Sequence, residues 1–405
     1  MIPEKENVKC IPVLSFFTGG GFLDLGFETA GYRIAWTNEI NPVFAKAYSH
    51  GMTSTHRAQD KNAPEKTISS IAPIQDLRAS EILQAAFPRE IPSLFGIIGG
   101  PPCIDFSRAG KNQGGRGRHG RLSGIYVETI CRIRPAFFVL ENVKGMVRTN
   151  SHRAYLERLQ KKLEENGYRI DSRVINALEL GVPQDRERLV MIGVRHDLAD
   201  QCAGRKIGKT ERNWFPWPSE SKYHDAKSRF PWPGKERRGE TVSCPKEIPY
   251  ELTVAAALNG GTPLSELPNG TEFFVPYSIH FKQVLEGDTK RRSFKRLHRY
   301  RYSPTACYGN NEVHLHPWEN RRLSVREAMR IQGIPDTYTL PADMHLSAKF
   351  RVVSNGVPVP LAHAVASSLR NFLTSSTALP KRENGVMISK LSMQSFEIPI
   401  PKPAL

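Results

Sequence analysis

Short apolar segments alternate with amphipathic segments of helical period through roughly the first half of this sequence. The apolar segments have the length and the β-branched or aromatic content of buried strands. Strands that alternate with helices in this way predict an α/β domain built on a parallel, doubly wound sheet. The predicted strands are residues 13–17, 32–40, 93–100, 136–143, 169–177 and 188–195, and the predicted helices are residues 22–31, 41–51, 124–133 and 151–167.

The alternation ends near Asp200. From there to about Trp318 the sequence is rich in proline, glycine, tryptophan and charge, and it has little periodicity. Helical patterns return at 321–336 and 357–373, and we expect the tail from about Ser375 to be loosely attached. The sequence therefore predicts two domains, a sheet domain and a smaller irregular domain, with the bounds 1–195 plus 340–405 and 196–335.

The charge balance predicts a polyanionic partner. The sequence holds 57 Lys and Arg against 40 Asp and Glu, a formal net charge of +17. Basic side chains that neutralise phosphates release condensed counterions, which favours binding to nucleic acid. The run KRRSFKRLHRYRY at 290–302 interleaves basic with aromatic side chains, and GGRGRHGR at 114–121 is a glycine-rich basic segment. Basic and stacking side chains together are typical of nucleic-acid-binding surfaces.

Cysteine usage and hydropathy restrict the location of the protein. The six cysteines are scattered with no CxxC pair, so we expect neither a metal site nor a disulfide framework. The first residues lack the features of a signal peptide, and no apolar run is long enough to cross a bilayer. We therefore expect a cytoplasmic protein that associates with nucleic acid and not with a membrane.

Glycines lie between the first predicted strand and the first predicted helix, in SFFTGGGFLDLG. Glycines at this position let a ligand approach the backbone at a helix N-terminus. Glu39 ends the second strand, where a carboxylate can accept hydrogen bonds from ribose hydroxyls, and Asp76 could reach an adenine amino group from a third strand end. No phosphate-binding lysine accompanies these residues, so the pattern favours an adenosine ligand without phosphates.

The stretch GGPPCIDFSRAGK at 99–111 holds one cysteine rigidly and then becomes flexible. Two prolines fix the backbone directly before Cys103, at the end of a predicted strand. Such a thiol would lie at the sheet edge where open α/β sheets bind ligands. By itself this segment slightly favours a buried cysteine that acts as a small apolar side chain, and the motifs in the rest of the chain reverse that preference.

Taken together, the motifs resemble those of bacterial DNA (cytosine-5)-methyltransferases, and they appear in the same order along the chain. They cover most of the chain outside roughly 197–300. The resemblance implies a Rossmann-like, S-adenosylmethionine-dependent methyltransferase fold with a smaller target-recognition domain at 196–335. The motifs are FFTGGGFLDLGFETAG, TNEI, GGPPCIDFS, FVLENV, VPQDRERLVMIGVR, RRLSVREAMRIQGIP and SNGVPVPLAHAVA.

The resemblance also implies residue roles. Cys103 resembles the nucleophile, Glu141 the acid beside it, and Arg186 and Arg188 the arginines that hold the target base. The residues that it implies for S-adenosylmethionine are Phe17, Thr18, Gly19, Gly21, Glu39, Ile40, Asp76, Leu77, Pro102 and Asn355. The residues that we expect to bind double-stranded DNA are Ser107, Lys111, Arg118, Arg121, Arg291, Arg292, Lys295, Arg296, Arg299 and Arg301.

The implied chemistry suits these residue types. A thiolate added to C6 of cytosine makes C5 nucleophilic, and nearby arginines would lower the pKa of the Cys103 thiol. Burial can raise the pKa of Glu141 so that its carboxyl keeps a proton for N3 of the base. Because C6 is hidden inside a duplex, the cytosine must be rotated out of the stack. One chain holds every implied group, so we expect a monomer to act.

The chain departs from the family pattern at four places, of which the first two support a non-catalytic alternative. Ile104 replaces a frequent glutamine, Gly117-Arg118-His119 replaces an Asp-x-Arg pattern, Ile40 replaces a frequent aromatic residue, and Ser354 and Gly356 replace a frequent glycine and alanine. The first hypothesis is a DNA methylase of a restriction–modification system, or one without a restriction partner. The alternatives are a methyltransferase for a tRNA cytosine and a non-catalytic DNA-binding relative.

Overall fold

A computed structural model describes residues 10–102, 120–219, 221–276, 278–291, 293–305, 308 and 314–375. Its centre is a six-stranded sheet with the strand order β2-β1-β3-β4-β7-β5. All of these strands fall where the sequence predicts them. The bounds are β1 Ile11–Phe16, β2 Tyr32–Asn38, β3 Gly96–Gly99, β4 Phe137–Val143, β5 Tyr168–Asn176 and β7 Glu187–Arg195.

The sheet is mixed, so the prediction of an all-parallel sheet is wrong for one strand. β1, β2, β3 and β4 pair in parallel, whereas β7 runs antiparallel to both of its neighbours, β4 and β5. The apolar patterns that locate strands carry no direction. The connection from β5 to β7 is only Ala177 to Arg186 and holds no crossover helix, which a parallel pairing would require.

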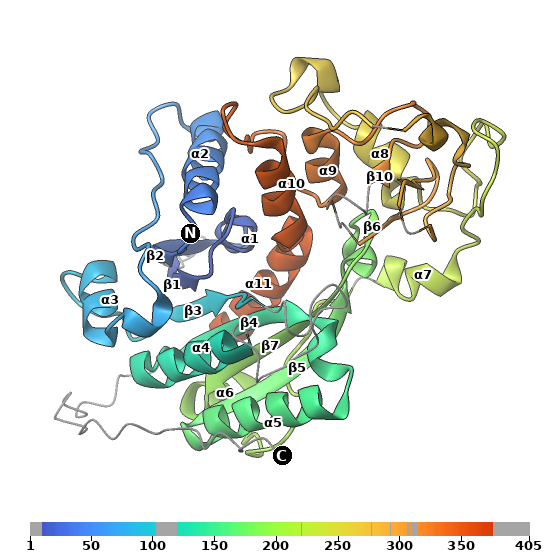
Figure 1. Cartoon of the computed structure of the whole chain (residues 1–405). Coiled ribbons are helices and arrows are strands. Elements are labelled where there is room, and N and C mark those ends of the chain that lie inside the picture. The colour runs from blue at the N-terminus through green and yellow to red at the C-terminus, as the bar shows by residue number, and fades with distance from the viewer. Residues whose placement is uncertain are drawn as a thin grey trace, which may run out of the picture.

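Helices cover both faces of the sheet (Figure 1). One face packs against α3, α4 and α5 in a single apolar cluster, and the other packs against α1, α6 and α11. Their bounds are α1 Phe22–Thr29, α3 Ala79–Ala86, α4 Gly120–Ile133, α5 Asn150–Glu165, α6 His196–Ala203 and α11 Val359–Thr374. This is the three-layer arrangement that the alternating sequence predicts.

A third apolar cluster joins α1 to α2 (Pro42–Gln59), α9 (Val325–Ile331) and α10 (Leu346–Asn355). Asn41 caps α2 as predicted, because its side chain accepts hydrogen bonds from the backbone N–H groups of Val43 and Phe44. Tyr338 completes the cluster: its hydroxyl donates to the backbone oxygens of Gly20, at 2.7 Å, and Ala47, at 3.1 Å. A residue close to the C-terminal end of the chain therefore supports the glycine-rich turn near its beginning.

Between α6 and α9 the described chain has only short elements, as the irregular composition predicts, and in Figure 1 these extend to one side of the sheet. The helix predicted at 321–336 is shorter than expected, because α9 covers Val325–Ile331 only. Asp76 does not end a strand, as the sequence suggested; it lies in a 3₁₀ turn over Ile74–Asp76. The short elements there are α7 Ala226–Arg229, α8 Val254–Asn259, β8 Lys295–Arg296, β9 Ser303–Pro304 and β10 His314–Leu315, and β9 pairs with the short strand β6 Gln184–Asp185, which precedes α6.

Packing continues across the predicted domain boundaries. Trp214, Phe215 and Trp217 lie beyond residue 195 but belong to the apolar cluster that contains α11. Ile331 of α9 packs against Leu258 of α8, while Ala328 and Met329 of the same helix pack against the third cluster. The division into two domains stays a prediction, and these contacts are where its two parts adjoin. Among the described residues, no helix is both long and apolar enough to span a membrane.

Gly51 tests the packing of the third cluster. A Cβ on Gly51 would lie 2.0 Å from the Tyr338 ring. Alanine normally favours a helix interior over glycine by about 1 kcal/mol, but here overpacking should outweigh that gain. We predict that Gly51→Ala lowers the free energy of unfolding by about 1–3 kcal/mol in denaturant titrations.

Gly234 is the matched control, because a Cβ there would meet nothing within 4 Å. Gly234→Ala should leave the free energy of unfolding unchanged or raise it by up to about 1 kcal/mol. A Gly51→Ala protein as stable as the Gly234→Ala protein would contradict the packing of Tyr338.

Candidate active site

The glycine-rich turn after β1 adopts a backbone that few side chains tolerate. Phe17, Gly19 and Gly21 have φ angles of 53°, 59° and 80°. A Cβ on Gly20 would lie 2.6 Å from Val352 of α10, whereas a Cβ on Gly19 would meet nothing closer than 3.9 Å. The turn is therefore packed tightly on the α10 side and open at Gly19, where its backbone can contact a ligand.

The carboxylate of Glu39 is fixed against this turn. One oxygen accepts the backbone N–H of Gly19 at 2.8 Å, and the other accepts that of Asn41 at 2.8 Å. Burial raises the pKa of Glu39 above its usual value, and the two backbone hydrogen bonds partly offset this shift. The end of β2 and the glycine turn are thus joined through Glu39, and the role of Glu39 at a ribose stays a prediction.

The remaining residues predicted to bind the cofactor have different surroundings. Thr18 is buried, and its hydroxyl contacts the Ser15 hydroxyl at 3.1 Å. Ile40 leaves 57% of its surface exposed, and Asp76 is also exposed. Asn355 is exposed at the last position of α10. Leu77 and Pro102 are half-buried, and Phe17 is half-buried against Tyr126, with the ring centroids 6.0 Å apart.

The segment that carries Asp76 is tied to the end of β2. The side-chain amide of Asn38 donates to the backbone oxygens of Ser70, at 3.0 Å, and Ala72, at 2.9 Å. These bonds hold the chain before Asp76 beside the strand end that carries Glu39. Asp76 therefore approaches the same sheet edge, although from a turn and not from a strand.

A second cluster lies where β4 ends and β7 begins. Arg188 is the register partner of Val143, two residues beyond Glu141 on β4, so the two charged side chains are diagonal neighbours on one face. Arg188 Nε lies 3.0 Å from Glu141 Oε1, and each side chain exposes only 12% of its surface. The structure thus joins two of the predicted catalytic residues in one ion pair.

This pair adjoins the start of the segment that carries Cys103. A Cβ on Gly100 would lie 2.8 Å from Glu141 Oε2, so a side chain there would displace the carboxylate from its present position. Asn142 donates from Nδ2 to the backbone oxygen of Pro101 at 3.2 Å. The Glu-Asn pair of the ENV motif therefore contacts the residues just before Pro102, while Cys103 itself lies outside the described residues.

Burial raises the pKa of Glu141 above its usual value, although the nearby Arg188 and Arg186 partly lower it. Removing a carboxylate from water favours its protonated form, and here that effect exceeds the attraction of the two guanidinium groups. Glu141 can therefore hold a proton at a pH where an exposed glutamate would have lost it.

Arg186 contacts the C-terminal motif. Its side chain is fully buried, and Nη2 donates to the backbone oxygens of Ser354, at 2.9 Å, and Gly356, at 2.7 Å. These two carbonyls flank Asn355. The buried guanidinium thus connects the arginine motif of β6 and β7 to the predicted cofactor residue, in addition to any contact with a base.

One residue predicted to bind DNA is instead buried. Arg296 has no exposed surface, and its guanidinium donates to the backbone oxygens of Phe281, Val284, His316 and Glu319. Burial lowers the pKa of Arg296 to about 10, which still leaves it charged at neutral pH. The prediction that Arg296 contacts DNA is wrong, because these carbonyls hold it inside the protein.

The other described residues of the DNA prediction are accessible to different degrees. Arg121 and Arg291 are exposed, and Lys295, Arg299 and Arg301 are half-buried. Arg299 forms a two-bond ion pair with Glu286. The predicted DNA contacts that lie outside the described residues are Ser107, Lys111, Arg118 and Arg292.

Three residues with structural roles at these sites escaped the sequence analysis. Asp24 lies fully buried under the glycine turn, where it accepts a hydrogen bond from Ser15 at 2.6 Å and burial raises its pKa to about 7. Glu286 and Tyr338 support Arg299 and the glycine turn from distant parts of the chain. An acidic residue inside the first predicted helix was a local sign that Asp24 has a special role. The sequence near Glu286 and Tyr338 gives no sign of the distant residues that they contact.

Comparison with known proteins agrees with this geometry. Residues 11–371 match the family model described as C-5 cytosine-specific DNA methylase. The type II methyltransferase M.NmeDI of Neisseria meningitidis serogroup C is 42% identical over 376 residues, which cover 92% of this chain and 86% of that protein. M.FnuDI of Fusobacterium nucleatum is 31% identical over 381 residues, which cover 91% of this chain and 97% of that protein.

Among solved structures, the Dnmt2 methyltransferase of S. pombe has a similar fold. Its TM-score is 0.55 at 13% identity, with 90% of this chain and 100% of that chain covered. The chain belongs to the C-5 cytosine-specific DNA methylase family and is a DNA (cytosine-5)-methyltransferase.

Proposed function

We propose that this chain methylates C5 of a cytosine in a specific double-stranded DNA sequence, with Cys103 as the nucleophile and S-adenosylmethionine as the methyl donor. The observation that carries the proposal is the buried Glu141–Arg188 pair, set against the Gly100-Pro101 backbone that leads to Cys103. The curated relatives above are named type II methyltransferases, which favours a role in a restriction–modification system.

The residues around the glycine turn fit S-adenosylmethionine. The open backbone at Gly19 and the buried Glu39 carboxylate offer acceptors for ribose hydroxyls, and the exposed Ile40 offers an apolar surface for adenine. Asp76, exposed at the same edge, suits the adenine amino group. Carboxylates instead of basic side chains suit a ligand that carries a sulfonium and no phosphate. When bound, this cofactor supplies an electrophilic methyl group.

The chain's own groups would activate the base. The Cys103 thiolate forms a bond to C6 of the rotated-out cytosine, and Glu141 gives its proton to N3, so the electron density gained by the ring is localised at C5. Arg188 holds the Glu141 carboxyl in place and can donate to an oxygen of the base. After methylation the proton on C5 leaves to a base, the C6–sulfur bond breaks to release the thiolate, and N3 returns its proton to Glu141, so that neutral 5-methylcytosine and the starting enzyme remain.

Arg186 would act as a positioning residue in this scheme. It holds the backbone on both sides of Asn355, at the end of α10, and so keeps the predicted cofactor contact in place relative to the base-activating strand β7. The irregular region between α6 and α9 would read the DNA sequence. Phosphate contacts there would set the position, and a few side chains would read base edges. We propose that a single chain suffices and that no metal takes part.

The activity can be tested in cells. We predict that bisulfite sequencing of genomic DNA from cells expressing the wild-type chain shows one methylated cytosine context. Cys103→Ala should abolish this signal, because no other group would add to C6. Methyl incorporation into tRNA serves as the comparison: labelled tRNA with unlabelled DNA would overturn the proposal in favour of an RNA substrate, and an active Cys103→Ala protein would overturn the covalent route.

Replacement of Glu141 tests the proton transfer. We predict that Glu141→Gln lowers kcat on duplex DNA by about 10²–10⁴-fold while DNA affinity stays nearly constant. The wild-type rate should also fall as the pH rises through the raised pKa of Glu141, because the protonated form is then lost. The residual rate of Glu141→Gln should lack this fall.

Glu187 provides the matched control, because it lies one residue from Arg188, is more exposed, and pairs with Lys144 at 2.6 Å. Glu187→Gln should retain wild-type kcat and the wild-type pH profile in single-turnover assays. A Glu141→Gln enzyme that keeps the full rate and the same pH profile would refute the assigned role.

A further inference from the structure

We propose that Arg299 reads a guanine of the DNA recognition sequence from an aromatic-lined pocket in the irregular region, an inference that rests on the proposed function. Arg299 belongs to the basic run at 290–302. The sequence alone does not distinguish the members of this run that contact bases from those that contact phosphates. In the structure the basic residues of this run differ in how far they are buried and in which side chains they contact.

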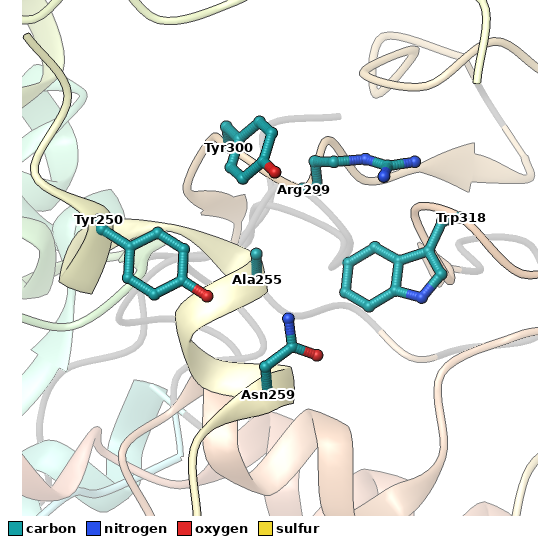
Figure 2. A pocket seen from close by; sticks show the side chains of 6 residues that line it. All are labelled: Tyr250, Ala255, Asn259, Arg299, Tyr300 and Trp318. Atoms are coloured by element: carbon teal, nitrogen blue, oxygen red, sulfur yellow. The ribbon is translucent and has the colours of Figure 1, made fainter. Parts of the chain in front are cut away.

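The pocket is a hollow of about 120 Å³ that opens to solvent, and its lining is aromatic and polar. In Figure 2 the Arg299 guanidinium extends above the Trp318 ring, with Tyr300 beside it and Tyr250 and Asn259 on the other side of the opening. Ala255 and Asn259 come from α8, so a helix forms the floor. A hollow of this size is below the range of ligand pockets and has room only for the edge of one planar group.

A buried carboxylate holds the Arg299 guanidinium in one orientation. Glu286 is fully buried, and its two oxygens accept Nε of Arg299 at 2.8 Å and Nη2 at 2.9 Å. The backbone N–H of Arg299 donates to the same carboxylate at 2.9 Å. The guanidinium carbon lies 5.4 Å from the centre of the Trp318 ring, which restricts the group from a second side.

This arrangement leaves donors available at the far edge of the guanidinium. Arg299 has five N–H donors in its side chain, of which Glu286 takes one on Nε and one on Nη2. The described residues provide no hydrogen-bond partner for the two on Nη1 or the second on Nη2. Two adjacent donors in one plane match the O6 and N7 acceptors of guanine in the major groove, whereas adenine and cytosine present a donor there.

The position of Arg299 favours base reading over phosphate binding. Its side chain is 20% exposed and fixed on two sides, whereas Arg291 of the same run is 52% exposed and lies 3.7 Å from its nearest acid, Asp288. Phosphate contacts carry no sequence information and do not need a fixed guanidinium. A guanidinium that is held in one orientation discriminates between bases, because its two donors cannot turn to fit a base edge that presents a donor of its own.

The acidic cluster behind Arg299 serves to hold it and does not fit a metal site. The cluster contains Glu236, Glu286 and His298. Tyr300 donates its backbone N–H to Nδ1 of His298 at 3.0 Å, so the ring proton is on Nε2, which faces a Glu236 oxygen at 3.1 Å. Burial also lowers the pKa of His298, which favours this neutral ring. The two carboxylates are therefore already hydrogen-bonded, Glu286 to Arg299 and Glu236 to Thr241, and the protonated Nε2 of His298 has no lone pair to offer a cation.

The experiment uses a pool of duplexes with randomised positions around the methylated cytosine, read out twice for each protein. Bound duplexes are selected and sequenced, and methylated duplexes are identified by bisulfite sequencing. We predict that Arg299→Lys, which keeps the charge but loses the paired donors, lowers the preference at one guanine position by about 5- to 150-fold in both readouts. Preferences at the other positions should stay as in wild type.

Two further variants make the result decisive. The double variant Arg299→Gln/Glu286→Gln removes both charges, so it avoids an unpaired buried carboxylate that could prevent folding. It should show the same loss at the same guanine. Arg291→Gln is the control within the basic run, and it should weaken binding to all sequences equally and reduce the salt slope by about one, with every base preference retained.

Preference for the guanine that survives in both Arg299 variants, or a loss spread evenly over all sequences, would overturn the inference. The two readouts separate it from the proposed function. If wild type methylates no duplex but its binding selects a guanine that depends on Arg299, the inference stands and the proposed methylation fails.

Discussion

The geometry of the candidate active site depends on the direction of one strand. β4 reaches the ligand-binding edge of the sheet at its C-terminal end, where Glu141 lies, and a parallel neighbour would place its own beginning at the opposite edge. Because β7 runs antiparallel to β4, the start of β7 meets the end of β4, and Arg188 comes within 3.0 Å of Glu141. The short connection from β5 forces this reversal, so the absence of a crossover helix there is what brings the acid and the arginine together.

Hydrogen bonds then gather distant segments around this pair. Asn142 holds the Pro101 carbonyl, Arg186 holds the carbonyls beside Asn355, and β6 pairs with β9 of the irregular region. Thr305 adds a hydrogen bond to the backbone oxygen of Asp185 at 2.6 Å. The residues just before Arg186 are thus bonded to the part of the chain proposed to read DNA. A movement of the irregular region would therefore move the residues at the start of β7, the strand that carries Arg188.

The sequence predicted most of the sheet domain because its signals are local. Periodicity located the strands and the main helices, and the order of elements in such sheets located Glu39 at a strand end, whereas its hydrogen bond to the glycine turn came from the structure. The direction of β7 and the turn around Asp76 could not be predicted, because apolar spacing does not encode pairing. The burial of Arg296 also depends on carbonyls up to 23 residues away, which a basic run does not reveal. The ion pair between Glu286 and Arg299 likewise could not be predicted, because it joins residues that are not neighbours in the sequence.

The packing of α1 against α11 has a consequence for how such a chain can diversify. Gly26 of α1 leaves no room for a Cβ, which would lie 2.3 Å from Ala362 of α11, so the first and last described helices are in direct backbone-close contact. The first and last helices of the sheet domain thus pack on each other. The irregular region is inserted in the sequence between these two helices. Loops in such an insertion can lengthen, shorten or be exchanged while the closed core keeps its register. If this insertion reads the DNA as proposed, new sequence preferences can arise in evolution without rebuilding the sheet core.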